Sequence, residues 1–311
     1  MSTPTPLETS ANAPQRKVTG AVWLALVLVY VVWGSTYLGI RIVVRTMPPF
    51  LSAGTRFVTA ALVLAAIVAL RYGPGALRAT RAQLGSAVLV GLLLVLGGNG
   101  LVVLGETSVP SGLAALLVAA VPIWVVVLRA VTGDRPPPST VAGVLVGLAG
   151  LAVLTSPGLS GEVRLSGVLM VVAASVLWSL GTFAGSKLPL PANPFTGSAY
   201  QMLAGGIGGL LVGLLRGETR GLDVGSFSTA SWVALAYLVL IGSVVGFTAY
   251  AWLLRSSAPL SLVATYAYVN PVVAVALGAL ILDEALTWPI LLGGAIVVVA
   301  VGVIVSTERK K

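Results

Sequence analysis

The sequence predicts an all-α integral membrane protein, with ten transmembrane helices in two inverted five-helix repeats around a central cavity. Hydrophobic residues make up 57% of the 311-residue chain and charged residues 9%, and the mean hydropathy is +1.03. A soluble domain has roughly 25% charged residues. Apolar runs of membrane-spanning length recur along the chain, and landmark residues of the first half recur, in order, in the second half.

The apolar runs define the helices one by one. A helix needs about 20 apolar residues to cross a bilayer, and clusters of Pro and Gly, such as 72–75 and 136–138, separate the runs. The fifth and tenth runs are short or rich in glycine, and the brief loops leave no room for a soluble domain. The predicted helices cover residues 20–41, 49–70, 83–104, 110–131, 139–155, 165–186, 195–215, 230–254, 260–282 and 288–306.

The domain boundaries follow from these helices. Residues 1–19 are predicted to be a disordered cytoplasmic tail, 20–155 the first five-helix repeat, 163–306 the second, and 307–311 a basic cytoplasmic tail. With the N-terminus inside, twelve Lys and Arg residues fall in cytoplasmic segments and five in external ones. Because positive charge in short loops stays on the cytoplasmic side, both termini are expected in the cytoplasm.

The internal repeat carries most of this prediction. A shift of 145 residues places Trp33 on Trp178, and a shift of 149 places Pro122 on Pro271. Since each repeat holds five helices, an odd number, the second must enter the membrane in the opposite orientation. Inverted repeats are typical of secondary transporters with a site near the bilayer midplane. The other matched pairs are Pro49 with Pro194, Phe50 with Phe195, Pro110 with Pro259, and Asp134 with Asp283.

The residue types present exclude several kinds of chemistry. The chain has no Cys and no His, which excludes disulfides, thiolate metal sites, Ser-His-Asp triads and histidine proton relays. We therefore predict no catalytic residues, no metal and no cofactor. The net charge of +9 lies mainly in short loops, where it sets orientation and does not indicate a nucleic-acid partner.

The stretch from Tyr266 to Pro271 indicates a polar break in the helix 260–282. Proline removes the backbone donor to the carbonyl four residues back, and membrane helices tolerate this where neighbours or water repair it. Tyr266 and Asn270 share a helix face beside the break, and both are candidate substrate-binding residues. Pro122 occupies the matching place in the first repeat, so both prolines are candidate breaks or hinges. The alternative is that Asn and Tyr only join helices and the proline is a tolerated kink.

Aromatic and hydroxyl side chains mark two further candidate substrate-binding faces. Trp33, Thr36 and Tyr37 lie along one side of the first helix, and Trp178 and Thr182 repeat the pattern in the second repeat. Two such faces opposite one another could hold a ring or an alkyl ammonium by stacking or cation-π attraction. Helix packing and a belt at the lipid headgroups are the alternatives.

Three other polar residues are candidates inside the membrane. Asn99 lies among glycines in the helix 83–104, and Tyr250 shares a face with Ser243 and Phe247. Both are predicted to line the cavity, with helix packing as the alternative for Asn99. Arg56 is the only charge well inside a predicted span. It either reaches the outer headgroups, pairs with a carboxylate or carbonyls in the bundle, or attracts an anionic group of a substrate.

No Asp or Glu lies in the middle of a predicted helix. Glu106, Asp283 and Glu284 fall at the predicted outer helix ends and Asp134 at an inner end, positions typical of capping and salt bridges. A proton antiport through a mid-membrane carboxylate is therefore poorly supported. Facilitated diffusion and coupling through an acid at a helix end both stay open.

Several segments together resemble the EamA family of the drug/metabolite transporter superfamily, and within it the YedA-like exporters. The resemblance covers nearly the whole chain outside the tails. It implies ten helices in two inverted repeats, a central cavity and export of small metabolites from a bacterial cell, with amino acids among the substrates of some relatives. Substrate identity does not carry over. The segments are 33–37 (WGSTY), 53–57 (AGTRF), 98–100 (GNG), 109–112 (VPSG) and 265–271 (TYAYVNP).

These features predict a secondary transporter that exports a small amphipathic metabolite, such as an amino acid, an aromatic compound or a drug-like molecule, across the bacterial plasma (inner) membrane by alternating access. The expected partners are the small-molecule substrate and the lipid bilayer, and the protein is expected to be a monomer or a weak homodimer. The alternatives are a channel or facilitator for small solutes and a membrane-embedded enzyme acting on lipids. The enzyme would need clustered His, acids or a nucleophile-base pair, which the sequence does not offer.

Overall fold

The computed structural model describes residues 20–133, 138–154, 163–255 and 266–308, and the described residues contain helices and no strand. The first half holds α1 (Gly20–Val43), α2 (Pro49–Tyr72), η1 (Pro74–Leu77), α3 (Arg81–Gly91), η2 (Leu92–Asn99), α4 (Gly100–Gly105), α5 (Ser111–Val118), α6 (Val121–Val131) and α7 (Pro138–Leu154). The second half holds α8 (Leu165–Lys187), α9 (Pro194–Leu215), η3 (Val224–Ser226), α10 (Thr229–Tyr237), η4 (Leu238–Val245), α11 (Gly246–Arg255), α13 (Tyr266–Leu282) and α14 (Trp288–Glu308).

Within the described residues, seven helical stretches are long and apolar enough to cross a membrane. Three shorter apolar helices accompany them, Pro138–Gly150, Val269–Leu282 and Trp288–Val303. Large apolar side chains cover the outside of the bundle; Leu70 is 89% exposed and Leu215 is 87% exposed. Such a surface is stable in lipid and would aggregate in water. The seven stretches are Gly20–Val43, Pro49–Tyr72, Arg81–Gly105, Ser111–Leu128, Leu165–Lys187, Pro194–Leu215 and Thr229–Tyr250.

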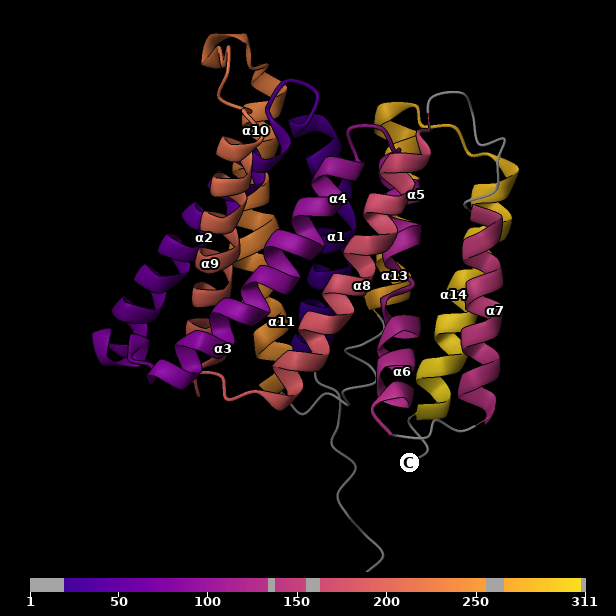
Figure 1. The fold of residues 1–311 in the computed structure, drawn as a ribbon, viewed down its shortest axis with the longest axis horizontal. Coiled ribbons are helices and arrows are strands. Elements are labelled where there is room, and N and C mark those ends of the chain that lie inside the picture. The colour runs from indigo at the N-terminus through magenta and orange to yellow at the C-terminus, as the bar shows by residue number, and fades with distance from the viewer. Residues whose placement is uncertain (1–19, 134–137, 155–162, 256–265, 309–311) are drawn as a thin grey trace, which may run out of the picture.

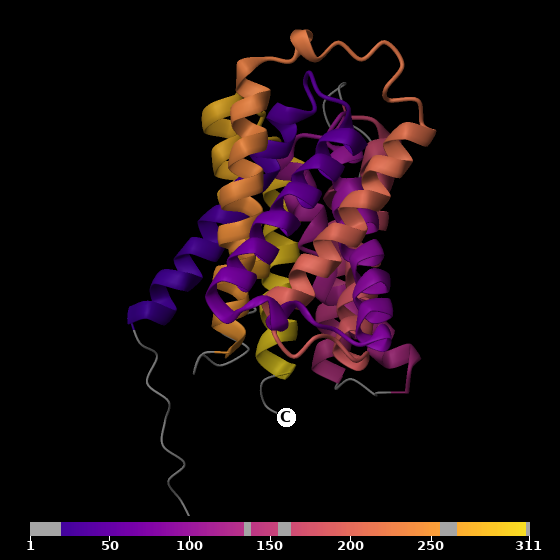
Figure 2. The ribbon, with the colours of Figure 1, turned by 90° about the vertical axis from the view of Figure 1, so that its left-hand side faces the viewer.

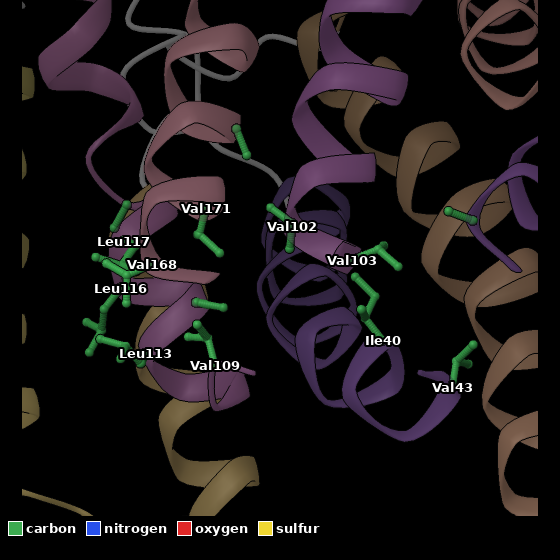
Figure 3. Packing of buried hydrophobic residues seen from close by; sticks show 14 of the residues in the cluster. Ile40, Val43, Val102, Val103, Val109, Leu113, Leu116, Leu117, Val168 and Val171 are labelled. Carbon is green, nitrogen blue, oxygen red and sulfur yellow. The ribbon is translucent and has the colours of Figure 1, made fainter. Parts of the chain in front are cut away.

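The helices pack as pairs that run the length of the molecule. Figure 1 shows α7 and α14 together at one edge, with α2, α3 and α9 at the opposite edge, and Figure 2 shows the helices crossing the molecule from end to end. Helices α2 and α9 approach so closely that a Cβ on Gly54 would lie 2.9 Å from the carbonyl oxygen of Gly206. A cluster of buried aliphatic residues fills the space where α1, α4, α5 and α8 meet (Figure 3).

Two membrane-spanning helices contain a π-helical segment. In the first, η2 (Leu92–Asn99) joins α3 to α4, and in the second, η4 (Leu238–Val245) joins α10 to α11. The two segments are the same length and lie 146 residues apart in the sequence. Turns of π-helix are rare and occur often at functional sites, so both segments draw attention to the helices that pack against them.

The two prolines of the predicted breaks differ. The predicted helix 110–131 is interrupted at Ala119 and Ala120, and α6 restarts at Val121 with Pro122 in its first turn. By contrast, α13 continues through Pro271 without interruption, so the prediction of a break at this proline is corrected. Pro271 lies in the second turn of the described helix, where it costs α13 one backbone hydrogen bond. The predicted start of this helix, 260–265, lies outside the described residues, as do Asp134 and the tail 1–19.

Candidate transport site

Four partly buried aromatic side chains from three helices form one cluster, called here the aromatic cluster: Trp33 of α1, Phe247 and Tyr250 of α11, and Tyr266 of α13. The ring centroid of Trp33 lies 5.6 Å from that of Phe247, 5.0 Å from that of Tyr250 and 5.2 Å from that of Tyr266. The Tyr250 and Tyr266 centroids lie 5.6 Å apart. These separations and the mostly tilted or edge-to-face geometries are those of favourable aromatic pairs.

A glycine and an amide hold the aromatic cluster together. A Cβ at Gly246 would lie 2.5 Å from Nε1 of Trp33, so the missing side chain lets α11 approach α1. With its amide oriented so that the nitrogen donates, Asn270 bonds to the carbonyl oxygens of Tyr30 and Tyr266, each at 3.2 Å. Asn270 is 7% exposed and therefore joins α13 to α1 directly beneath the aromatic rings, the packing role that the sequence left as an alternative.

Arg56 is enclosed by protein. Its side chain is 4% exposed, Nε donates to Ser243 Oγ at 3.0 Å, and the guanidinium carbon lies 4.6 Å from the centroid of the Phe57 ring. Its Nη1 has no hydrogen-bond partner among the described residues. Because the guanidinium is buried, Arg56 does not reach out to lipid headgroups, which removes one of the three roles that the sequence left open.

Arg56 and the aromatic cluster contact neighbouring turns of the same helix. A Cβ on Gly242 would lie 3.0 Å from Thr36 Cγ2 and 3.4 Å from Arg56 Nη2, whereas Gly246, four residues later, faces Trp33. A small cavity also borders Arg56. Its volume is about 10 Å³, roughly the space of one water molecule, so a metabolite needs the helices to separate before it can enter. The lining residues are Ile40, Val43, Ser52, Ala53, Arg56, Val103, Leu235 and Leu238.

The predicted second aromatic face does not meet the first. Trp178 packs against η2, where a Cβ at Gly98 would lie 2.7 Å from its ring, and it has no aromatic partner among the described residues. Thr182 is exposed and its hydroxyl donates to the Trp178 carbonyl at 2.9 Å. The side chain of Asn99 donates weakly, at 3.5 Å, to the carbonyl of Leu94 in its own helix. The structure therefore does not bring these three residues to the aromatic cluster.

Thr36 and Tyr37, the other predicted residues of α1, make different contacts. The Thr36 hydroxyl donates to the Trp33 carbonyl at 2.6 Å, so it is satisfied within its own helix. Tyr37 packs against the aliphatic cluster of Figure 3. Sequence reasoning missed a bond from α1 to α10, in which Ser35 Oγ and the Tyr237 hydroxyl lie 2.6 Å apart. The small residues Gly242 of η4 and Gly246 of α11, four positions apart, were the signal for close contact between α1 and the helix that continues from α10.

Three carboxylates lie at the end of the bundle where α2 and α5 begin. Glu218 accepts the backbone N–H groups of Phe50 and Leu51, each at 3.0 Å. Glu284 accepts the N–H groups of Ser111 at 2.8 Å and Gly112 at 3.0 Å, together with the Ser111 hydroxyl at 3.0 Å. Both bind free donors at a helix start, where negative charge is favoured. These two carboxylates act as helix caps, and for Glu284 the sequence led us to expect such a role.

Glu106 differs from the other two carboxylates. It is fully buried, and neither of its side-chain oxygens has a hydrogen-bond partner among the described residues. Its backbone carbonyl accepts a bond from Nη1 of Arg41. The sequence predicted ordinary capping or salt bridging at the membrane interface for this residue. That prediction is wrong, because the chain after α4 turns the side chain into the protein.

A bundle of apolar helices with polar groups buried between them defines a polytopic membrane protein. The EamA-like transporter family matches residues 19–156 and 165–306, and the chain belongs to this family. The "Uncharacterized inner membrane transporter YedA" of Escherichia coli is 39% identical over 256 residues, which cover 82% of this chain and 80% of that protein.

Other relatives have names that mention amino acids. The "Probable terminal-alkyne amino-acid exporter" of Streptantibioticus cattleyicolor is 31% identical, with 90% of this chain and 91% of that protein covered. The "Probable amino-acid metabolite efflux pump" of Escherichia coli is 27% identical, with 87% and 90% covered. A crystal structure of another protein matches 94% of this chain and 99% of its own with a TM-score of 0.64 at 19% identity, and it shares the fold.

Proposed function

We propose that this transporter exports a small amphipathic metabolite across the bacterial plasma membrane by alternating access, and that the aromatic cluster binds the apolar part of that metabolite. The observation that carries the proposal is the meeting of Trp33, Tyr250 and Tyr266, from three helices of both halves of the chain, at 5.0 to 5.6 Å between ring centroids. Aromatic rings in such an arrangement offer a large, rigid apolar surface with polar edges, which suits an amphipathic ligand.

We propose a topology of ten transmembrane helices in two inverted repeats, 20–155 and 163–306, with both termini in the cytoplasm. The two separate matches of the family to the chain and the two π-helical segments spaced by 146 residues support the repeat. The excess of Lys and Arg in the segments assigned to the cytoplasm supports the orientation.

The proposed motion is a rocking of one half against the other around the aromatic cluster. The interruption before Pro122 gives one flexible point, since two separate helices can tilt where one continuous helix cannot. Pro271 is proposed as the matching point through bending, with its helix intact. The close α2–α9 contact at Gly54 and Gly206 keeps these two helices together during the motion.

The names of two relatives support amino acids as the chemical class of the substrate. Two proteins that match about nine tenths of this chain are named as exporters of amino acids or their metabolites. An amino acid with an apolar side chain, an aromatic compound or a drug-like molecule each has the apolar part that the aromatic cluster would bind. Amino acids are therefore the first compounds to test.

The test is counterflow in proteoliposomes preloaded with a panel of unlabelled amino acids and amphipathic amines. We expect saturable uptake of a labelled compound that is stimulated by the unlabelled compound inside. Trp33→Ala should lower this uptake about tenfold or more, because the variant loses three aromatic contacts. Asn270→Ala should lower it because Tyr266 loses its connection to α1. The matched control is Trp252→Ala, since Trp252 lies on α11 as Phe247 and Tyr250 do but is 41% exposed.

Each outcome separates the proposed carrier from its alternatives. Flux without stimulation from the inside would indicate a channel and would overturn alternating access. Equal activity in Trp33→Ala and Trp252→Ala would remove the aromatic cluster from the site. Chemical conversion of a lipid in the vesicles, without solute flux, would indicate the enzyme alternative.

A further inference from the structure

A basic and an acidic side chain are both buried, and each has at least one polar atom without a hydrogen-bond partner among the described residues. Arg56 is 4% exposed with Nη1 unpaired, and Glu106 is fully buried with both carboxyl oxygens unpaired among the described residues. Buried charged groups in proteins are nearly always paired or hydrogen-bonded. These are the largest unmet hydrogen-bonding demands in the part of the chain that the structure describes, and they call for a ligand or for water.

The two groups belong to one region. Arg56 and Val103 line the same small cavity. Glu106 follows Val103 by three residues, so the two residues lie on the same face of the helix where α4 ends. Each group acts electrostatically on the other, but no ion pair joins them. Arg56 Nη1, on α2, therefore offers a donor without a partner among the described residues, and the two carboxyl oxygens of Glu106, directly after α4, offer acceptors.

We propose that Arg56 and Glu106 form a clamp for a zwitterion, in which Arg56 binds the carboxylate and Glu106 binds the ammonium of a free α-amino acid. This clamp rests on the proposed function and narrows its substrate class. Gly242 next to Arg56 and Gly246 next to Trp33 lie four residues apart, slightly less than one turn of the π-helical segment that ends at Val245. An amino acid held by the clamp can thus lay its side chain on the aromatic cluster.

The surroundings of Glu106 change the pKa of its carboxyl group. Burial raises the pKa of the Glu106 carboxyl, which follows the membrane-spanning helix, well above its usual range; Glu284 raises it further, and Arg41 and Arg56 oppose the shift. Tyr37 faces it from α1. An ammonium group beside Glu106 favours its charged form and opposes this shift, which is the role that the clamp assigns to the amino group of the ligand.

The test uses labelled phenylalanine and two analogues that each lack one charged group. These are phenethylamine, without the carboxylate, and 3-phenylpropionate, without the ammonium; all three keep the ring for the aromatic cluster. In counterflow with the full-length protein, we expect phenylalanine to compete about tenfold or more better than either analogue. Equal potency of the three compounds on the wild-type protein would overturn the clamp.

Variants assign each charge to its residue. In Glu106→Gln, 3-phenylpropionate should compete as well as phenylalanine, and in Arg56→Gln phenethylamine should do so. The control Glu218→Gln alters a carboxylate whose oxygens are already bound at the start of α2, and it should keep the wild-type preference. A Glu106→Gln protein that still prefers the zwitterion would overturn the clamp, and the wild-type comparison still decides if a variant fails to fold.

The clamp and the proposed function can fail separately. Trans-stimulated flux of an uncharged or singly charged amphipathic compound, dependent on Trp33 but with no uptake of any zwitterion, would overturn the clamp and leave the proposed function in place. Loss of all trans-stimulated flux would overturn the proposed function itself.

Discussion

In the proposed repeat, the contact of α1 with η4 and α11 corresponds to the contact of α8 with η2 and α4, yet the two contacts differ in chemistry. In both, a tryptophan packs on a glycine of a helix that contains a π-helical segment: Trp33 on Gly246, directly after η4, and Trp178 on Gly98, within η2. Among the described residues, only Trp33 of these two has aromatic neighbours.

The sequence explains the difference. The spacing of 146 residues between the π-helical segments puts Leu101 and Leu104 at the positions of Phe247 and Tyr250, and the shift of 149 puts Leu117 at that of Tyr266. The proposed repeat would thus carry one aromatic and one aliphatic version of the same contact. Symmetry of the proposed repeat therefore does not imply symmetry of the proposed binding surface.

The most direct test of this difference is to give the Trp33 contact the aliphatic side chains of the Trp178 contact. The triple variant Phe247→Leu, Tyr250→Leu and Tyr266→Leu keeps apolar volume but removes every ring around Trp33. We expect a loss of counterflow of about tenfold or more, because aromatic pairs contribute roughly 0.5–1.5 kcal/mol each beyond their buried area. Transport should be compared at equal amounts of folded protein. Wild-type rates in this variant would show that the two contacts are functionally alike.

A second, smaller effect concerns the packing of α8. A Cβ at Gly181 would lie 2.6 Å from Leu94 Cδ2, whereas the nearest atom at Gly185 is 3.7 Å away. We expect Gly181→Leu to lower the free energy of unfolding by about 1–3 kcal/mol through overpacking, and Gly185→Leu to lower it less. The check is the unfolding midpoint of each variant in detergent, together with transport. Equal and normal behaviour of both variants would contradict the close packing of α8 on η2.

The smallest expected effect is at Thr182, the counterpart of Tyr37 by the shift of 145 residues. Its side chain is exposed and its hydroxyl bonds only to the Trp178 carbonyl of its own helix. Thr182→Val should change the unfolding free energy by less than about 0.5 kcal/mol and leave counterflow unchanged. A clear loss of transport would place α8 at the substrate path and restore the two-sided site that the sequence predicted.

The sequence predicted the membrane fold and some of the site. Trp33, Tyr250, Tyr266 and Asn270 were recognised one by one, because aromatic and amide side chains inside apolar helices are conspicuous. Which of them meet is decided by contacts between residues more than 200 positions apart, and periodicity within a helix carries no information about that. The same reasoning paired Trp33 with Trp178, although the structure gives Trp33 other neighbours.

The buried carboxylate was beyond sequence reasoning for a related reason. Glu106 directly follows the end of α4, and a helix end in a membrane protein usually lies at the water interface. Whether that end is covered depends on how α1 and α2 cross it. Pro122 and Pro271 show the same limit: both remove one backbone donor, but only the first coincides with an interruption of its helix.

The π-helical geometry of η4 also fixes the rotation of α11 about its axis relative to α10. An α-helix advances by about 100° for each residue, and a π turn accommodates one residue more than an α turn. If a single turn of η4 relaxed to α geometry, α11 would rotate by about that angle relative to α10, and Phe247 and Tyr250 would leave Trp33. A change in winding within one helix would then open the aromatic cluster without any helix leaving its place in the bundle.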